Sequence, residues 1–290
     1  MKELVVVSGK GGTGKTTLTA GFAALAQNKV MADCNVEAAD LRFLLNPTNF
    51  KTESFVNRRI AVIDRERCLD CRICLDVCRF DAISEDYRVN PLNCEGCRFC
   101  ARMCPIEIIR LAGQENGQWH RADTPFGPLV FAQLGVAAEN PGQLVALVRR
   151  EAQKLAKEKN LNYIVIDGPA GAGGSANSAV TGVQMAVIVT EPTLSGIHEL
   201  KRILKLTGRF RVPALVVVNK FDLNIENTRI IEAYCREQEI EVAGKIPYDP
   251  GVIKALQAGE IPVRYLGEGK VSKTVVKIWN RVYERLREIE

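Results

Sequence analysis

The sequence contains no apolar run that approaches the 18 or more residues needed to span a membrane. Its N-terminus also lacks the layout of a secretory signal, because the apolar run Leu4–Val7 is followed at once by a loop rich in lysine and glycine. The net charge of +5 is small for 290 residues, which argues against nucleic acid as the main ligand. We therefore expect a cytoplasmic protein, with nucleic acid and a membrane both disfavoured as partners.

Histidine is scarce, with only His120 and His198 in the chain, whereas cysteine is abundant. Eight of the ten cysteines fall between positions 68 and 104, and Cys34 and Cys235 stand alone. In a reducing compartment, clustered cysteines bind metal more often than they form disulfides. The remaining composition is ordinary, 47% hydrophobic and 25% charged, which excludes a disordered, collagen-like or coiled-coil chain.

Short β-branched runs alternate with helical patterns over most of the chain. Strands are expected at 4–7, 29–32, 129–136, 163–166, 185–189, 214–218 and 241–246, and helices at about 15–27, 142–159, 197–207 and 272–289, with one more that ends near 237. Apolar runs buried on both faces and separated by helices indicate a mostly parallel α/β sheet. Polar or glycine residues follow strand after strand, and this sheet edge is where such folds bind ligands.

A segment rich in cysteine, arginine and aspartate interrupts the α/β pattern. The sequence CLDCRICLDVC at 68–78 recurs 26 residues later as CEGCRFCARMC at 94–104. The simplest organisation is a small pseudo-symmetric domain inserted into a larger one. We therefore predict an insert at 56–120 within one α/β domain that comprises 1–55 and 121–290.

The segment Gly9–Thr16 fits the phosphate-loop pattern G-x-x-x-x-G-K-[S/T], with a strand before it and a helix after it. Its glycines allow backbone N–H groups to close around phosphate oxygens, and the helix N-terminus directs positive charge at the anion. We expect Lys15 to reach the β- and γ-phosphates and the Thr16 hydroxyl to ligate Mg²⁺. The residues expected to bind nucleotide here are Gly9, Lys10, Gly11, Gly12, Thr13, Gly14, Lys15, Thr16 and Thr17.

Each cysteine repeat has the spacing C-x₂-C-x₂-C-x₃-C, which is the bacterial ferredoxin run for [4Fe–4S] clusters. In such runs three cysteines ligate one cube and the fourth crosses to the other. The spacing therefore predicts two [4Fe–4S] clusters. The expected ligands are Cys68, Cys71, Cys74 and Cys104 for the first cluster and Cys94, Cys97, Cys100 and Cys78 for the second.

Zinc is the main alternative for these cysteines. Zinc sites commonly pair two separate C-x-x-C knuckles or include histidine, and both histidines lie outside the repeats. Arg79 stands where many ferredoxins have a proline, so we expect the surroundings of one cluster to differ. Cys34 and Cys235 are expected to be small buried apolar residues rather than ligands.

Lys10 is a second lysine in the phosphate loop, and the run K-G-G-x-G-K-T-T resembles the deviant Walker A signature of the MinD/ParA/nitrogenase-iron-protein class of ATPases. With the cysteine repeats, the chain resembles MinD-superfamily P-loop ATPases that contain an inserted two-cluster ferredoxin domain. In that class the lysine crosses a dimer interface to touch the partner's nucleotide. The resemblance implies ATP, Mg²⁺ and an ATP-dependent homodimer, or a pair with a similar ATPase. Phosphate contact within one chain, or simple solvation, is the alternative for Lys10.

The resemblance also implies two switch segments, one from Asp33 to Asp40 and one that begins at Asp167. Asp33 and Asp167 end strands, where carboxylates can hold Mg²⁺ directly or through water. The family usually has aspartate where this chain has Asn35, and that aspartate orients the attacking water. Hydrolysis is therefore expected to be slow or to depend on Asp33 or Asp40, although a plain surface role is open for Asp40. The expected catalytic residues are Lys10, Lys15, Asp33, Asp40 and Asp167.

The run Asn219-Lys220-Phe221-Asp222 matches N-K-x-D, which selects guanine in GTPases. The deviant Walker A signature favours adenine instead. The resemblance then implies that the base lies near Asn219 and near the loop that contains Pro247 and Asp249.

The combination favours an ATP-gated protein for electron transfer or metallocluster maturation, with its redox or metallocluster client unknown. The alternative is a positioning or regulatory ATPase like MinD, whose clusters sense redox state or stabilise the insert. Cobyrinic-acid-type amidation is disfavoured because we find no glutaminase-like domain. An apolar stripe in the last helix permits membrane anchoring, but docking on the core gives the same pattern and is favoured. The stripe consists of Val275, Ile278, Trp279, Val282, Leu286 and Ile289.

Overall fold

The computed structural model describes residues 1–135 and 141–289 of the chain, which divides into two compact units. The large unit contains Met1–Thr52, Trp119–Gln133 and the C-terminal part of the chain, and the small unit contains Glu53–Gln118. Val136, the last residue of the strand expected at 129–136, lies outside the described residues.

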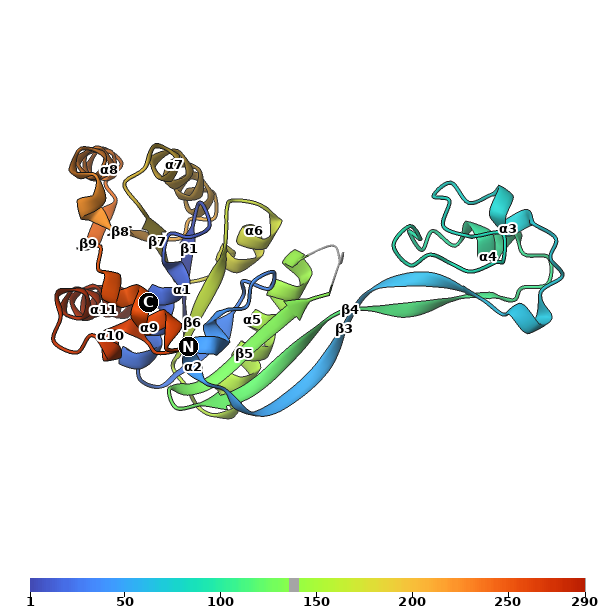
Figure 1. Ribbon diagram of the computed structural model, residues 1–290, viewed down its shortest axis with the longest axis horizontal. Coiled ribbons are helices and arrows are strands. Elements are labelled where there is room, and N and C mark those ends of the chain that lie inside the picture. The colour runs from blue at the N-terminus through green and yellow to red at the C-terminus, as the bar shows by residue number, and fades with distance from the viewer. Residues whose placement is uncertain (136–140, 290) are drawn as a thin grey trace. The chain divides into compact units, whose positions relative to one another are not determined.

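Nine strands within the described residues form one sheet, in the order β3-β4-β5-β2-β6-β1-β7-β8-β9 (Figure 1). From β5 to β9 every neighbouring pair is parallel. The expected mostly parallel α/β fold is therefore confirmed. The strands are β1 (Lys2–Ser8), β2 (Lys29–Asp33), β3 (Thr48–Ile63), β4 (Ile109–Thr124), β5 (Gly127–Leu134), β6 (Tyr163–Ala170), β7 (Met185–Thr190), β8 (Ala214–Asn219) and β9 (Glu241–Ile246).

Helices of the large unit pack in groups against this sheet. Helices α1, α10 and α11 contact one another, whereas α5 contacts α6 and α7 contacts α8. The helices of the large unit are α1 (Lys15–Leu25), α2 (Leu41–Leu45), α5 (Pro141–Glu158), α6 (Gly174–Val180), α7 (Leu194–Arg209), η2 (Phe221–Leu223), α8 (Ile225–Glu237), α9 (Pro250–Gln257), α10 (Pro262–Tyr265) and α11 (Lys270–Glu288). The small unit contains η1 (Arg65–Arg67), α3 (Ile73–Asp76) and α4 (Phe99–Met103).

The central strands are buried on both faces. Leu4 and Val6 of β1 belong to one core cluster with Phe22 of α1, and Val5 between them is equally inaccessible to water. Because side chains alternate along a strand, Val5 faces the opposite helix layer. Burial on two faces explains why these strands read as short continuous apolar runs in the sequence.

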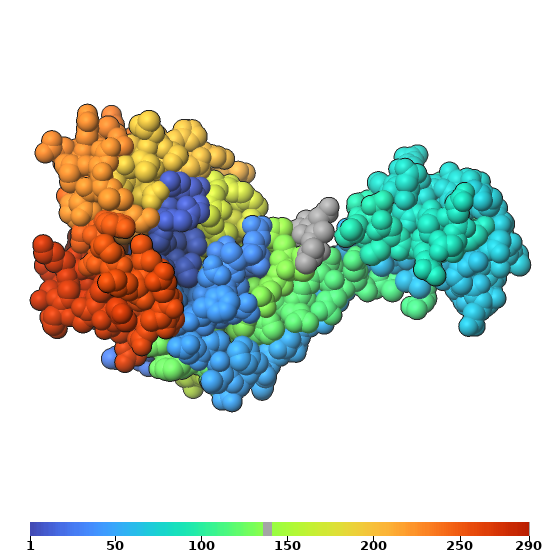
Figure 2. All heavy atoms as spheres, viewed as in Figure 1, coloured from blue at the N-terminus to red at the C-terminus, as the bar shows by residue number. Residues whose placement is uncertain are grey.

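The apolar stripe of α11 faces the core, as expected for a docked helix. Its inward side chains are buried, and the ring of Trp279 lies 5.1 Å from the ring of Phe22. The elements from α8 to α11, coloured orange to red in Figure 2, form one side of the large unit. No helix within residues 1–135 and 141–289 is long and apolar enough to cross a membrane. The buried stripe of α11 serves packing of this helix on the core.

The sequence patterns do not predict β3 and β4, although each strand is 16 residues long. Most side chains of β3 are exposed, so the strand has no buried face to produce an alternating or continuous apolar signal. Gly113 in β4 leaves room for the side chain of Val56 in β3, since a Cβ atom on Gly113 would lie 2.7 Å from Cγ1 of Val56. Helices α2, α6, α9 and α10 are also absent from the expectation, because each has eight residues or fewer.

The small unit repeats one local structure twice. Helices α3 and α4 each follow an arginine in the left-handed conformation, Arg72 with φ 66° and Arg98 with φ 65°. Six of the eight clustered cysteines lie within or against a thin core whose buried members include Ala61, Ile83 and Ile108, whereas Cys71 and Cys97 are exposed. So few buried apolar side chains supply little stability on their own.

We predict that Phe22→Ala destabilises the large unit by about 3–5 kcal/mol, because it removes a fully buried ring and its contact with Trp279. Urea unfolding measures this loss. Phe43→Ala is the matched control, since Phe43 is 59% exposed and its removal should cost under about 1 kcal/mol. Equal losses in the two variants would contradict the docking of α11 on α1.

Candidate functional site

The loop between β1 and α1 has the backbone of a phosphate cradle. Gly12 and Gly14 have φ angles of 78° and 88°, a conformation that only glycine adopts readily. A Cβ atom on Gly14 would lie 2.3 Å from Nδ2 of Asn219, which donates a hydrogen bond of 2.8 Å to the carbonyl of Thr13. Gly12 faces open space, with nothing within 4 Å of an added Cβ. The loop is thus held from behind by β8 and is open where an anion would bind.

Three side chains of α1 converge on Asp167, which lies within β6 (Tyr163–Ala170) and not at its end, so the expectation that Asp167 ends its strand is wrong. Lys15 Nζ lies 3.5 Å from Oδ1, Thr16 Oγ1 donates to Oδ2 at 2.7 Å, and Thr19 Oγ1 donates to Oδ1 at 3.1 Å. Asp167 is fully buried and Lys15 is 6% exposed. Sequence patterns predict Lys15, Thr16 and Asp167 as site residues but not Thr19. Its signal is the helical spacing, since Thr19 lies one turn after Lys15 and on the same face.

Asp33 ends β2 directly beside Asp167, and the two residues are register partners. Asp33 is also fully buried, and its carboxylate accepts the N–H groups of Asn35 and Leu41, both at 3.1 Å. Burial, and then the charge of Asp167, raise the pKa of Asp33 well above its ordinary value. Two carboxylates beside the Thr16 hydroxyl form a set of hard oxygen donors of the kind that Mg²⁺ prefers.

The side chains of Asn35 and Asp40 in the first switch are directed elsewhere, although the backbone N–H of Asn35 binds Asp33. Asn35 donates from Nδ2 to the carbonyl of Ala38 at 2.9 Å, which ties its amide into the local turn. Asp40 occupies the N-cap position of α2, where its exposed side chain caps no N–H group. The structure thus brings Asp33 to Asp167 but does not bring Asp40 to them.

Lys10 is bound to residues that follow β7 in its own chain. Its Nζ forms an ion pair with Glu191 and lies 3.3 Å from Oγ1 of Thr193. Lys220 lies on the other side of Glu191, at 3.3 Å. Glu191 was not among the expected site residues, because nothing in the local sequence pattern indicates a partner for Lys10.

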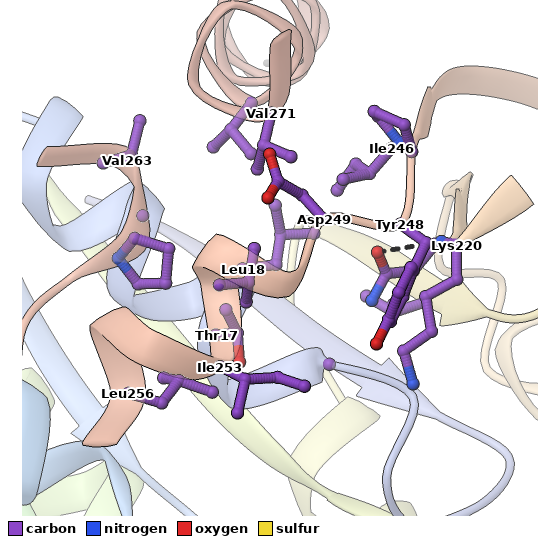
Figure 3. A pocket seen from close by; sticks show the side chains of 18 of the residues that line it. Thr17, Leu18, Lys220, Ile246, Tyr248, Asp249, Ile253, Leu256, Val263 and Val271 are labelled. Atoms are coloured by element: carbon purple, nitrogen blue, oxygen red, sulfur yellow. Dashed lines mark hydrogen bonds between the residues drawn. The ribbon is translucent and has the colours of Figure 1, made fainter. Parts of the chain in front are cut away.

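A cavity of about 930 Å³, open mouth included, adjoins the phosphate loop. Asn219, Pro247 and Asp249 line it, as expected, together with Gly12, Gly14 and Thr17. Apolar side chains from α1, β9 and the C-terminal helices point into it (Figure 3), among them Leu18, Ile246, Ile253, Leu256, Val263 and Val271. An apolar slot next to a phosphate cradle is suited to a planar base attached to a phosphate chain.

Two polar contacts fix the rim of this cavity. Asp249 Oδ1 accepts the N–H of Gly251 at 2.8 Å and so caps α9. Asp222 Oδ1 accepts the N–H of Tyr248 at 2.7 Å, and Asp222 is not among the lining residues. The dashed line in Figure 3 marks a third contact, from the N–H of Lys220 to the side chain of Asn219.

The eight clustered cysteines line two separate hollows in the small unit, in the two predicted sets. Those that share the first hollow are Cys68, Cys71, Cys74 and Cys104. Those that share the second are Cys78, Cys94, Cys97 and Cys100. Each hollow thus contains three cysteines of one repeat and the last cysteine of the other.

Backbone N–H groups already point at sulfur in the second hollow. Ala61 donates to Cys94 Sγ and Ala82 to Cys78 Sγ, both at 3.4 Å. Burial raises the pKa of Cys100 to about 11, so without metal this thiol stays protonated at neutral pH. Nowhere in residues 1–135 and 141–289 are three or more His, Cys, Asp or Glu side chains grouped to hold a metal ion. The iron–sulfur clusters therefore stay a prediction.

Cys34 and Cys235 lie outside both hollows. Both are fully buried, and burial raises the pKa of Cys235 to about 11 and that of Cys34 well above its ordinary value. They are packed as small apolar residues, which agrees with the expectation for them.

The comparisons with known proteins agree with this geometry. A relative that spans the whole molecule is an uncharacterized protein of Methanocaldococcus jannaschii, MJ0578, 30% identical over 99% of this chain and 96% of its own length. A local match, 31% identical, covers 17% of this chain and 60% of the pyruvate synthase subunit PorD of Methanothermobacter marburgensis.

A solved structure shares the fold across nearly the whole chain. The septum site-determining protein MinD of Pyrococcus horikoshii, complexed with Mg-ADP, superposes with a TM-score of 0.60 at 20% identity, over 97% of this chain and 95% of that one. The CobQ/CobB/MinD/ParA nucleotide binding domain matches residues 4–263. That match covers the phosphate loop, both buried carboxylates and the cysteine repeats, and the chain therefore belongs to the CobQ/CobB/MinD/ParA nucleotide-binding family.

Proposed function

We propose that this protein is an ATP-dependent switch that couples its nucleotide state to a two-cluster ferredoxin-like unit, for electron transfer or metallocluster maturation. One observation carries the proposal: a single chain combines a phosphate cradle with two hollows that each gather four cysteines. The first feature is a nucleotide site, and the second fits a pair of low-potential one-electron carriers.

Adenine is the base that the cavity favours. In an N-K-x-D site the aspartate would read guanine, but here the Asp222 carboxylate accepts the N–H of Tyr248 and does not line the cavity. The lining is mostly apolar, which suits a base recognised by shape and stacking. The likeness to a MinD that binds Mg-ADP supports the same choice.

Mg²⁺ fits the oxygen donors of Asp33 at the end of β2 and of Asp167 within β6. Thr16 would ligate it, and Asp33 and Asp167 would hold it directly or through water. The metal would neutralise charge on the phosphates, while Lys15, already buried beside Asp167, supplies the protein's own positive charge. Thr16 and Asp167, which contact each other at 2.7 Å, would both serve such an ion.

The cysteine hollows fit two [4Fe–4S] clusters on the chemistry of their donors. Each offers four sulfurs among apolar walls, and the second adds two N–H groups directed at sulfur. Metal binding requires thiolates, so it would release the protons that burial keeps on thiols such as Cys100. The clusters would also strengthen the thin core of the small unit.

ATP binding would bring two chains together through Lys10, as in the family that the phosphate loop resembles. Two copies of this chain, or this chain and a similar ATPase, are the proposed pair. We define the client protein only by its chemistry, as one that accepts electrons or a metallocluster. A purely regulatory ATPase anchored to a membrane by α11 is disfavoured, because the apolar side chains of α11 are buried.

We predict that the iron content follows the crossed pairing of the two repeats. Anaerobically reconstituted protein should contain about eight iron atoms and no zinc, and Cys71→Ala or Cys97→Ala alone should retain about four. Cys71→Ala combined with Cys104→Ala removes ligands of one cluster and should still retain about four. Cys97→Ala combined with Cys104→Ala should lose both clusters.

Iron analysis and electron paramagnetic resonance of the reduced protein measure these outcomes. Cys235→Ala is the control, because Cys235 is buried in α8 and should leave iron unchanged. Retention of four iron atoms in the Cys97/Cys104 double variant would instead indicate that each repeat binds its own cluster. Zinc in place of iron would contradict the ferredoxin-like assignment.

We predict that Asn35→Asp accelerates ATP hydrolysis by at least about tenfold, because a carboxylate can orient and partly deprotonate water where an amide cannot. Phosphate release measures the rate. Asn46→Asp, in the loop after α2, is a control that adds the same charge away from the site. An unchanged or lower rate in Asn35→Asp would show that Asn35 does not occupy the position of the family's catalytic aspartate.

Gating is tested by the cluster potentials measured with and without Mg-ATP. We expect Mg-ATP to shift at least one potential, partner affinity or the oligomeric state. Lys15→Ala should abolish the shift while its iron content stays complete, because the small unit does not contribute to the phosphate loop. No change in any of the three quantities for the wild-type protein would overturn gating.

A further inference from the structure

One carboxylate lies between the two lysines that flank the phosphate loop. Glu191, in the turn after β7, forms an ion pair with Lys10 through Oε1 and lies 3.3 Å from Nζ of Lys220 through Oε2. Lys220 Nζ is also 3.4 Å from the carbonyl of Gly12 in the loop itself. The two lysines and the loop are therefore linked through one side chain that is 14% exposed.

Lys10 is held at this position by more than the ion pair. Its Nζ lies 3.3 Å from the hydroxyl oxygens of both Thr193 and Ser195. Glu191 and Thr193 belong to the turn between β7 and α7, and Ser195 belongs to the first turn of α7 in the same chain. The ammonium group thus has a complete set of partners without any nucleotide or second chain.

Hydrogen bonds hold the turn that carries Glu191. Thr193 caps α7 by accepting the N–H of Gly196 at 3.0 Å, and Thr190 donates to the carbonyl of Gly196 at 3.1 Å. A Cβ atom on Gly196 would lie 2.3 Å from the carbonyl oxygen of Glu191. The turn is thus bonded to α7 through Thr190 and Thr193, on either side of Glu191.

The charge on Glu191 persists at neutral pH. Burial opposes ionisation, but the hydrogen bond from Lys10 and the charges of Lys220 and Lys10 together lower the pKa of Glu191 below its ordinary value. When Lys10 leaves, Lys220 still neutralises the carboxylate. Release of Lys10 therefore does not leave an unpaired, partly buried charge, which would be costly.

We propose that Glu191 is a positioning residue that keeps Lys10 on its own chain until phosphate competes for it, and so sets the ATP concentration at which two chains associate. This inference rests on the proposed function. The triphosphate bound to a second chain carries more negative charge than one carboxylate, so it can displace Glu191 as the partner of Lys10. Lys10 then contacts the nucleotide of that second chain.

The test is the ATP concentration that gives half-maximal dimer, measured by anaerobic analytical ultracentrifugation of the reconstituted protein. Glu191→Gln keeps the shape of the side chain but removes its charge, and it should lower this concentration at least about tenfold, equivalent to about 1.4 kcal/mol. Glu232→Gln is the matched control, because Glu232 pairs with Lys245 elsewhere in the large unit. The control should leave the concentration unchanged.

A double-mutant cycle separates positioning from a structural role. In a Lys10→Ala background, Glu191→Gln should produce no further shift in ATP affinity, which is measured by equilibrium dialysis. The same shift in both backgrounds would overturn the inference, since Glu191 would then act through Lys220 or the backbone. A higher ATP requirement for dimer formation in Glu191→Gln would overturn it as well.

The nucleotide-free protein supplies a readout that does not depend on the proposed function. Lys10 should react faster with an N-hydroxysuccinimide ester in Glu191→Gln than in the wild type, as measured by peptide mass spectrometry, while Lys201 reacts equally in both. Unchanged Lys10 reactivity would overturn the inference. If Lys10 is released but ATP causes no dimer, the proposed ATP-dependent pairing fails and the role of Glu191 stands.

Discussion

Two carboxylates without access to water, Asp33 at the end of β2 and Asp167 within β6, lie side by side, and the site is organised around them. Buried charges require partners. Helix α1 provides Lys15 and two hydroxyls to Asp167, and the N–H of Leu41 binds Asp33. These contacts place the first turn of α1, and with it the phosphate loop, at the edge of the sheet. They also tie the start of α2 to the same carboxylate, so a cation bound there would act on both elements.

The small unit is connected where it disturbs this arrangement least. Strands β2 and β5 are parallel neighbours, and the chain between them leaves through β3 and returns through β4, at one edge of the sheet. The central strands β6, β1 and β7 therefore keep the contacts that position the phosphate loop. An edge insertion adds residues where few buried contacts have to be rearranged, which is why large insertions are tolerated there.

The sequence predicted features that depend on local patterns. The phosphate loop, the strands around it and the distribution of cysteines between two hollows follow from glycine positions, apolar runs and cysteine spacing. What it did not predict depends on contacts between distant residues. Glu191 meets Lys10 across 181 positions, and nothing near either residue indicates the other. Strand β3 was not predicted because most of its side chains are exposed and form no apolar period. Strand β4 was not predicted because its buried positions include polar residues such as Asn116 and His120.

The cysteines of the small unit fill space in its core, and the proposed clusters would give them a second role as metal ligands. In the metal-free chain, Cys74 and Cys94 are part of the core itself, and burial raises the pKa of Cys74, so neutral thiols fill space that apolar side chains would otherwise fill. Cluster binding would replace these thiols with metal thiolates and make the same residues the strongest links in the unit. The core of the large unit contains none of them. If the proposed clusters are bound, their loss should unfold the small unit and leave the nucleotide site of the large unit intact. An effect of ATP on the clusters would then reflect coupling between the two units and not a shared stability.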